Sequence, residues 1–293
     1  MASPAAELDR WEGADVAVGQ IERRLGQLRA AAEEGGMIRT SVLTHLAWVP
    51  GEWEQQALDT LAGLAERHPS RTIVLLPQPE ADEDGIDAAL SLRAFTLPDS
   101  NRSICTEVIE LRLRGRRAEV PASIVAPLLV ADLPVFLRWR GLPPYGKRPF
   151  EELVDLVNRL IFDSTEWPDL PESYRPLAGV FDRTAVSDIA WARTSRWRHQ
   201  LASLWPAIAE VSTIRVRGTE AQAHLLAGWL RSRLERSVEL EHEPADRLLG
   251  VDIDGQPAPF PPGDPPRSSD VLSDELERFG RDAVYEASVA AAL

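Results

Sequence analysis

The sequence predicts an α/β protein made of two similar open α/β halves, built from βαβ units, with mostly parallel sheets and some antiparallel hairpin. Three observations lead to this prediction. Short apolar runs alternate with segments of helical apolar spacing, which is typical of parallel βαβ units. One later segment alternates strictly between apolar and charged residues, so it predicts a half-exposed antiparallel strand. The length of 293 residues favours two medium-sized domains.

Residues 1–39 predict an acidic helical leader. Val16–Glu34 carries apolar residues at helical spacing, and the pair Gly35-Gly36 ends the helix. The N-terminus has neither a basic region nor an apolar core, so we expect no signal peptide. We expect the leader to pack on the body of the protein or on a partner.

The N-terminal α/β domain is expected over residues 40–165. A strand, a helix and a second strand open it with short connections, which predicts parallel pairing. Ile109, Leu111 and Leu113 then alternate with charged residues, and a turn at Pro98–Asn101 would pair their strand with the preceding one. The expected elements are strands 41–46, 72–76, 88–96 and 104–114, and helices 53–67, 121–130 and 150–160.

The segment Val125–Gly141 is the most informative part of this domain. It runs through Asp132-Leu133-Pro134 into a short, fully apolar strand, which suits a strand buried on both faces. The strand ends on Arg138, Trp139 and Arg140. In open α/β sheets partners and ligands bind at the carboxyl ends of the strands. These three residues are therefore candidates for recognition.

The C-terminal α/β domain is expected over residues 166–293. Ala190-Trp191 ends a predicted strand and a helix opens near Trp197, which weakly repeats the pattern of Ala47-Trp48 and Trp53. The other expected elements are strand 212–217, a following helix with a capping box at Thr219 and Gln222, a Pro-rich loop over 255–269 and a final acidic helix over Asp270–Arg278.

Charge and composition exclude several classes of function. The net charge of −14 makes nucleic acid and anionic membrane surfaces poor partners. No window of 18 apolar residues occurs, so we expect no membrane span. The single cysteine, Cys105, cannot form an intrachain disulfide, and a reducing cytoplasm fits. Its strand position favours a buried apolar side chain over a reactive thiol.

The sequence contains no complete motif for catalysis, cofactor binding or metal binding. Gly141–Lys147 imitates a phosphate-binding loop, but Arg148 stands where Ser or Thr must bind magnesium, and two prolines remove backbone donors. There is no Gly-x-Gly-x-x-Gly fingerprint and no Gly-x-Ser-x-Gly elbow. The five histidines show no pair at metal-ligand spacing. We therefore predict a protein without catalytic residues, cofactor or metal.

Several short motifs are similar to those of one known family, the glucose-6-phosphate dehydrogenase assembly proteins, or OpcA family. The resemblance covers most of residues 40–290. The motifs that carry it are His68-Pro69-Ser70-Arg71, Cys105-Thr106-Glu107, Pro127-Leu128-Leu129, Asp132-Leu133-Pro134-Val135 with Trp139, Phe162-Asp163-Ser164, Asp188-Ile189-Ala190-Trp191, Arg193 and Trp197-Arg198.

The resemblance implies a function in carbohydrate metabolism without catalysis by this chain. Family members associate with glucose-6-phosphate dehydrogenase, the entry enzyme of the oxidative pentose phosphate pathway, promote its oligomeric assembly and raise its activity. The expected protein is thus a cytoplasmic allosteric activator. Cyanobacterial relatives are regarded as redox-responsive through cysteines, but with Cys105 alone thiol–disulfide control within this chain is excluded.

We predict a partner-binding site at the strand end and the loop that follows it. Aromatic side chains there offer rigid contact area, and arginines can pair with carboxylates. In the competing interpretation Trp139 closes the sheet edge and the arginines are solvated. The alternative function is a sugar-phosphate- or nucleotide-binding α/β enzyme or sensor. The predicted partner-binding residues are Arg138, Trp139, Arg140, Tyr145 and Arg148.

Overall fold

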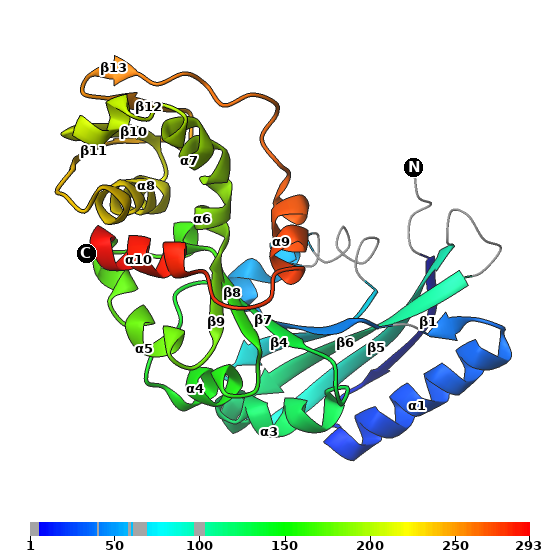
Figure 1. The fold of residues 1–293 in the computed structure, drawn as a ribbon. Helices are drawn as coiled ribbons and strands as arrows, with labels where there is room; N and C mark the ends of the chain where they lie inside the picture. The colour runs from blue at the N-terminus through cyan, green and yellow to red at the C-terminus, as the bar shows by residue number, and fades with distance from the viewer. Residues whose placement is uncertain (1–5, 40, 58–59, 61–68, 97–102) are drawn as a thin grey trace. The chain divides into compact units, whose positions relative to one another are not determined.

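The computed structural model describes the chain except for residues 1–5, 40, 58–59, 61–68 and 97–102. It divides into two compact units, Met1–Leu160 and Ile161–Leu293, which are described separately here. Residues 6–39, which the sequence assigns to a leader, lie within the first unit. The α/β class is confirmed, because each unit combines strands and helices (Figure 1).

The first unit contains a large, mixed sheet. Its strands follow the order β1-β5-β6-β4-β3-β7, and β2 pairs with β6. The central pairs β3–β4, β4–β6 and β3–β7 are parallel, and the βαβ pattern of the sequence predicts the first of them. The strands are β1 Ala6–Gly13, β2 Ile38–Arg39, β3 Leu43–Trp48, β4 Ser70–Gln78, β5 Gly85–Thr96, β6 Ser103–Arg114 and β7 Val135–Trp139.

The predicted antiparallel hairpin is confirmed. β5 and β6 pair in continuous register from Gly85 opposite Arg114 to Thr96 opposite Ser103. The turn predicted at Pro98–Asn101 lies outside the described residues. β1 pairs antiparallel with β5 as an edge strand. Half of the residues of β1 are charged, and a register shift between Glu7 and Asp9 interrupts the alternation, so the sequence shows no continuous strand pattern there.

The long helix of the first unit is also confirmed. α1, Val18–Glu34, buries Ile21, Leu25, Leu28 and Ala32 on one face, and it runs along the sheet of this unit (Figure 1). Gly36 follows the helix with a φ of 77°, a conformation that glycine adopts without strain.

Three other helix predictions for this unit need correction or cannot be followed. The helix expected over 121–130 is α3, Pro121–Val125, and then becomes a 3₁₀ turn over Ala126–Leu128. The helix expected over 150–160 is α4, Arg148–Val154. Most of the helix expected over 53–67 lies outside the described residues, although residues 54–57 are helical.

The predicted end of this helix, residue 160, was wrong. The helix ends at Val154, and hydrogen bonds of Asn158 then lead the backbone into the next strand. The Val135 N–H donates to the Asn158 side-chain oxygen (2.8 Å), and the Asn158 N–H donates to the Val135 carbonyl (2.9 Å). β8, Arg159–Phe162, follows directly, and the boundary between the units falls within it. Its apolar residues are fully buried, which suits a strand with both faces covered.

The second unit holds a smaller four-stranded sheet in the order β11-β10-β12-β13. The β10–β11 pair is parallel, and β12 pairs antiparallel with β10 and β13. Figure 1 shows α8 beside this sheet and α10 beside α8. The elements are α5 Leu177–Phe181, β9 Ala185–Asp188, α6 Ile189–Arg193, α7 Ser195–Ala202, β10 Thr213–Gly218, α8 Glu220–Leu234, β11 Glu239–Pro244, β12 Gly250–Ile253, β13 Gln256–Pro257, α9 Ser268–Leu276 and α10 Ala283–Ala292.

The capping box that begins α8 is confirmed. The Thr219 hydroxyl accepts from the Gln222 N–H (3.3 Å), and the Gln222 side chain accepts from the Thr219 N–H (3.2 Å). Gly228 in α8 permits a close approach of α10, because a Cβ at this position would lie 2.1 Å from the Ser288 carbonyl oxygen.

Two predictions in the second unit were wrong. Ala190 and Trp191 do not end a strand but lie in α6, because the Asp188 carboxylate accepts the Ala190 N–H (2.9 Å) and starts a helix there. The acidic helix expected over Asp270–Arg278 is α9, but it does not close the chain, since α10 follows.

Candidate functional site

The structure places three of the five predicted partner-binding residues in the interior of the first unit. Arg138, Trp139 and Arg140 retain 8%, 2% and 6% of their accessible surface. Tyr145 is half-buried and Arg148 is exposed. The three residues at the strand end that suggested an exposed recognition site are therefore buried.

Aromatic contacts explain this burial. Trp139 stacks on Trp48, with ring centroids 4.8 Å apart, and meets the edge of Phe150 at 5.1 Å. The Arg140 guanidinium lies over the Trp53 ring, 4.5 Å from its centroid. These contacts are those expected if the strand end is structural.

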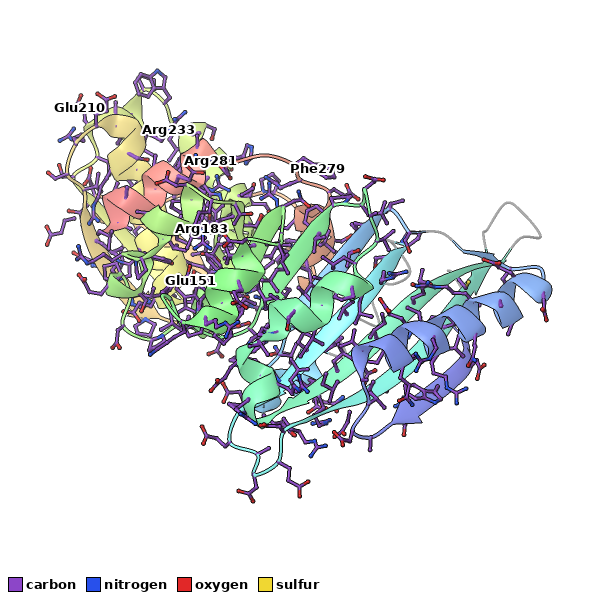
Figure 2. All side chains as sticks on the ribbon, turned by 90° about the horizontal axis from the view of Figure 1, so that it is seen from below. Glu151, Arg183, Glu210, Arg233, Phe279 and Arg281 are labelled. Atoms are coloured by element: carbon purple, nitrogen blue, oxygen red, sulfur yellow. The ribbon has the colours of Figure 1, made fainter. Side chains whose placement is uncertain are left out.

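The loop after β7 is held by its own polar groups. The Gly146 N–H donates to the Glu151 carboxylate (2.7 Å), and Glu151 is labelled in Figure 2. Arg148 donates to Glu152 at 2.6 Å, one helical turn later. Partner binding by the five residues remains a prediction, and Tyr145 and Arg148 are its accessible members.

The motifs behind the family resemblance meet instead in two buried polar centres, one in each unit. The first, here the Glu107 centre, consists of Arg29, Arg71 and Glu107. Arg29 of α1 donates two hydrogen bonds to the Glu107 carboxylate (2.5 and 3.1 Å), and Arg71 of β4 donates one (2.7 Å). Arg71 also donates to the Leu128 carbonyl (2.7 Å), so three of the motifs converge here.

Electrostatics keep the Glu107 carboxylate charged although its accessible surface is 0%. Burial alone would raise its pKa, but the hydrogen bond from Arg29 and the charge of Arg71 outweigh burial and hold the pKa below the ordinary 4.5. The centre thus ties α1, β4 and β6 together.

The second, here the Asp188 centre, consists of Ser164, Tyr174, Asp188 and Tyr285. One carboxylate oxygen of Asp188 accepts the N–H groups of Ser164 (3.0 Å) and Ala190 (2.9 Å). The other oxygen accepts the hydroxyls of Ser164 (2.6 Å) and Tyr285 (3.3 Å). The Ser164 and Tyr174 hydroxyls lie 2.9 Å apart. Two motifs that are distant in sequence therefore meet at the ends of β8 and β9.

No cation is among the hydrogen-bond partners of Asp188 in the described structure. Burial raises the pKa of Asp188 to about 7, and the negative charge of nearby Asp163 adds to this effect, while the donors from Ser164 and Ala190 oppose it. Burial and the charge of Asp188 also raise the pKa of Tyr174 well above 10.

Further motif residues lie next to this centre, and one of them, Trp191, bonds to the cap of α10. Arg193 donates to Asp163 (2.9 Å). The Arg198 guanidinium lies 3.4 Å from the centroid of the Trp191 ring, and burial lowers the pKa of Arg198 to about 10. The Trp191 indole N–H donates to Asp282 (3.0 Å), the residue that caps α10.

This arrangement is suited to holding structure rather than to turnover. Ser164 and Asp188 keep 0% and 1% of their accessible surface, so a substrate could reach them only if the unit opened. Among the described residues no group of three or more His, Cys, Asp or Glu side chains could hold a metal ion. Within the same residues no helix is long and apolar enough to cross a membrane.

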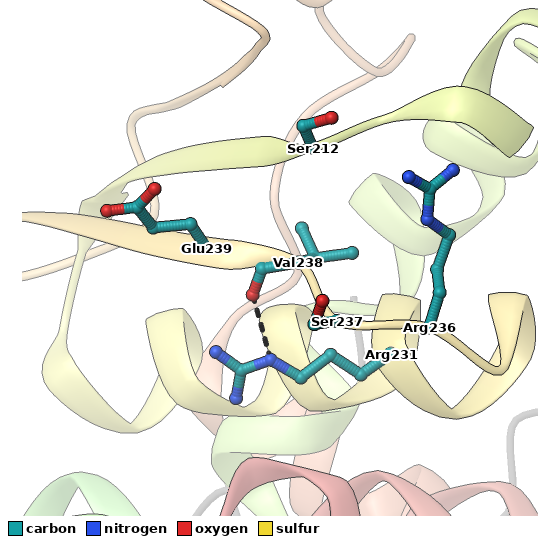
Figure 3. Close-up of a pocket in the computed structure, with 6 residues that line it drawn as sticks. All are labelled: Ser212, Arg231, Arg236, Ser237, Val238 and Glu239. Atoms are coloured by element: carbon teal, nitrogen blue, oxygen red, sulfur yellow. Dashed lines mark hydrogen bonds between the residues drawn. The ribbon is translucent and has the colours of Figure 1, made fainter.

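The second unit also has an open pocket of about 480 Å³ at its surface (Figure 3). The pocket lies at the amino ends of the parallel strands β10 and β11, beside the C-terminal end of α8, rather than at a carboxyl strand edge. Arg231 is fixed there by donating to the Val238 carbonyl (2.9 Å). The lining residues are Ser212, Arg231, Arg236, Ser237, Val238 and Glu239.

The sequence prediction missed both centres, although signals were present. Glu107 is spaced by two residues from Cys105 and Ile109, so it lies on the same, buried face of the strand. A charged residue therefore stands at a buried position. Such a residue requires a cation close by. Asp188 carried a weaker signal, since Asp directly before an apolar run is typical of a helix N-cap.

Two family models match most of the described chain. The model for the glucose-6-phosphate dehydrogenase subunit N-terminal domain matches residues 62–178, and that for the C-terminal domain of the same subunit matches residues 184–259. The first match includes Arg71 and Glu107, and the second includes Asp188.

Cyanobacterial relatives agree with these matches. A protein named "Putative OxPP cycle protein OpcA" from Synechocystis sp. is 26% identical over 70% of this chain and 45% of its own length. Proteins of the same name from Synechococcus elongatus and Nostoc punctiforme are 28% and 29% identical, over 69% and 62% of this chain and 50% and 42% of their own lengths. The chain thus spans about half the length of these relatives. The motifs and both domain matches lead to one conclusion: the chain belongs to the OpcA family of glucose-6-phosphate dehydrogenase assembly proteins.

Proposed function

We propose that this protein is a non-catalytic partner of glucose-6-phosphate dehydrogenase that promotes the enzyme's oligomerisation and raises its activity. The observation that carries the proposal is the pair of consecutive matches to the N- and C-terminal domains of a glucose-6-phosphate dehydrogenase subunit family. The protein would act in the oxidative pentose phosphate pathway, in the cytoplasm.

The buried centres support a binding role over a catalytic one. The carboxylates of the two centres, Glu107 and Asp188, are closed to solvent, and their hydrogen bonds hold helices in place. An enzyme needs reactive groups that a substrate can reach. A rigid scaffold that presents a surface is what a binding protein needs, because preorganisation lowers the cost of association.

The proposed mechanism is a shift of the enzyme's equilibrium. A binding protein raises activity only if it binds the active or assembled state of the enzyme more tightly than the inactive state. No group transfer by this chain is required.

Steady-state kinetics test the proposal. Glucose-6-phosphate dehydrogenase from the same organism is assayed for NADPH formation over a range of glucose 6-phosphate concentrations, with and without the purified chain. We expect no activity from the chain alone and a raised rate or lower half-saturation in the mixture. Superimposable saturation curves at all chain concentrations would contradict the proposal.

A further inference from the structure

The turn that follows α7 presents an indole to solvent. Trp205 is 67% exposed, and its neighbours Ala202, Pro206 and Ala207 are exposed as well. The turn is folded, because the Trp205 N–H donates to the Ala202 carbonyl (3.2 Å) and the Ala209 N–H to the Pro206 carbonyl (3.0 Å). Holding a large aromatic group on an ordered turn reduces the entropy that binding must overcome.

Hydrogen bonds connect this turn to the pocket of Figure 3. Arg236, which lines the pocket, donates to the Ala209 carbonyl (3.1 Å) and to Glu210 (3.4 Å). Glu210 and Arg233 are labelled in this part of the chain in Figure 2.

The six lining residues carry one net positive charge, and Glu210, which lies outside the lining, pairs with Arg236 (3.4 Å). The lining includes two guanidinium groups, those of Arg231 and Arg236, and one carboxylate, that of Glu239. In Figure 3 the Glu239 carboxylate lies at the far end from Arg236. Arg236 is exposed, and only one of its guanidinium nitrogens is used in the bonds to Ala209 and Glu210, so it has further N–H groups for a carboxylate from a partner.

Two other aromatic side chains of this unit are exposed, but neither belongs to the turn that is bonded to the pocket. Phe260 is 71% exposed but meets the Trp197 ring at 5.3 Å. Phe279 is 73% exposed and lies in sequence between Arg278 and Arg281. Trp205 differs because it belongs to an apolar turn bonded to the rim of a pocket.

We propose that Trp205 and the pocket of Figure 3, which Arg236 lines, form the surface through which the second unit binds glucose-6-phosphate dehydrogenase. The indole enters an apolar recess of the enzyme, and a carboxylate of the enzyme pairs with Arg236. Trp and Arg are the residue types that dominate binding energy at interfaces, and guanidinium pairs with carboxylate through two parallel hydrogen bonds. This inference rests on the function proposed above.

Affinity measurements on four variants test the inference. Biosensor titrations of the full chain against the immobilised enzyme compare Trp205→Ala and Arg236→Glu with the wild type. We expect each to weaken binding by at least about thirtyfold, the effect of a hot-spot residue. Phe279→Ala and Arg233→Glu are the matched controls, an exposed aromatic and an exposed arginine outside the pocket, and both should bind as the wild type does.

A further variant separates binding from folding. Arg236→Glu removes the bonds to Ala209 and Glu210, so its thermal unfolding is compared with that of the wild type. Ser212→Asp adds a negative charge to the pocket without touching those bonds, and should weaken binding at least about tenfold.

The outcomes distinguish this inference from the function beneath it. If the wild-type chain binds the enzyme and Trp205→Ala and Ser212→Asp bind equally well, the inference is wrong and the proposed function stands. If the wild-type chain does not bind the enzyme, the proposed function fails and this inference fails with it.

Discussion

The most deeply buried motif carboxylate of each unit, Glu107 in the first and Asp188 in the second, has different partners from the other. Glu107 receives hydrogen bonds from the guanidinium groups of Arg29 and Arg71. Asp188 receives them from two backbone N–H groups and from the hydroxyls of Ser164 and Tyr285. The pKa of Glu107 is lowered, and that of Asp188 is raised to about 7.

The chemistry of the partners explains this difference. A guanidinium can only donate, so the Glu107 carboxyl must be ionised to satisfy it. A hydroxyl can also accept, so Ser164 or Tyr285 can take a hydrogen bond from a protonated Asp188. The two carboxyl groups are buried to a similar extent, but the partners of Glu107 require it to be charged, whereas those of Asp188 allow it to be neutral.

The largest expected effect comes from removing the charge of the Glu107 centre. Glu107→Gln leaves two arginines at a buried site without a counter-charge, so the free energy of unfolding should fall by about 3–5 kcal/mol. Urea denaturation measures this. Glu110→Gln, on the same strand but half-exposed, is the control and should change stability by less than about 0.5 kcal/mol. Equal stability of the two variants would contradict the assigned role of Glu107.

The pH dependence of stability should differ in sign between the centres. The folded state binds a proton at Asp188 more tightly than the unfolded state does, so its contribution is complete at low pH. This contribution should be lost as pH rises from about 4 to about 7, by about 2–4 kcal/mol. The contribution of Glu107 is present at neutral pH and is lost as pH falls below its ordinary pKa of 4.5.

Asp188→Asn isolates the first of these effects. The amide is always neutral, and its N–H₂ can donate to the Ser164 and Tyr285 hydroxyls, so the fold should persist. Denaturation at a series of pH values should show the fall between pH 4 and 7 in the wild type and not in the variant. A fall of the same size in both proteins would assign it to other groups.

A smaller effect is expected where α10 approaches α8. Gly228→Ala places a Cβ against the Ser288 carbonyl, pushes α10 and Tyr285 from Asp188, and should destabilise by about 1–3 kcal/mol. Gly179→Ala is the control, because nothing lies within 4 Å of the added Cβ in α5, and it should be neutral or slightly stabilising. Similar unfolding midpoints for both would argue against the close approach.

The smallest expected effect is at Cys105, which is 2% exposed on the strand of Glu107. Cys105→Ala should cost about 1 kcal/mol or somewhat more, as for other buried groups replaced by a smaller one. Activation of the enzyme should be unchanged under reducing and oxidising conditions. Loss of activation by a normally folded variant would instead assign a function to the thiol.

Local patterns predicted much of the fold. The α1 helix, the β5–β6 hairpin and the capping box at Thr219 and Gln222 are each encoded within about a dozen residues per element, so spacing and turn chemistry sufficed. The ends of α4 and the existence of α10 were missed. α10 is Ala-rich and apolar on most of its surface, so it shows no amphipathic period.

The buried centres could not be predicted because their partners are distant in sequence. Arg29 and Glu107 are 78 positions apart, and Asp188 and Tyr285 are 97 apart. The interior position of Trp139 also depends on tertiary contacts, since its ring stacks on Trp48 of another strand. The motifs contained both carboxylates, but their partners Arg29 and Tyr285 lie outside the motifs and could be found only from the fold.

The most direct test of the proposed function is to measure the molar mass of the species that form when the two proteins are mixed. Glucose-6-phosphate dehydrogenase from the same organism is passed through a size-exclusion column with light-scattering detection, alone and with the chain. We expect one heavier species that contains both proteins, with the enzyme in a higher oligomeric state. Two separate peaks, with the enzyme's mass unchanged at every ratio, would contradict it.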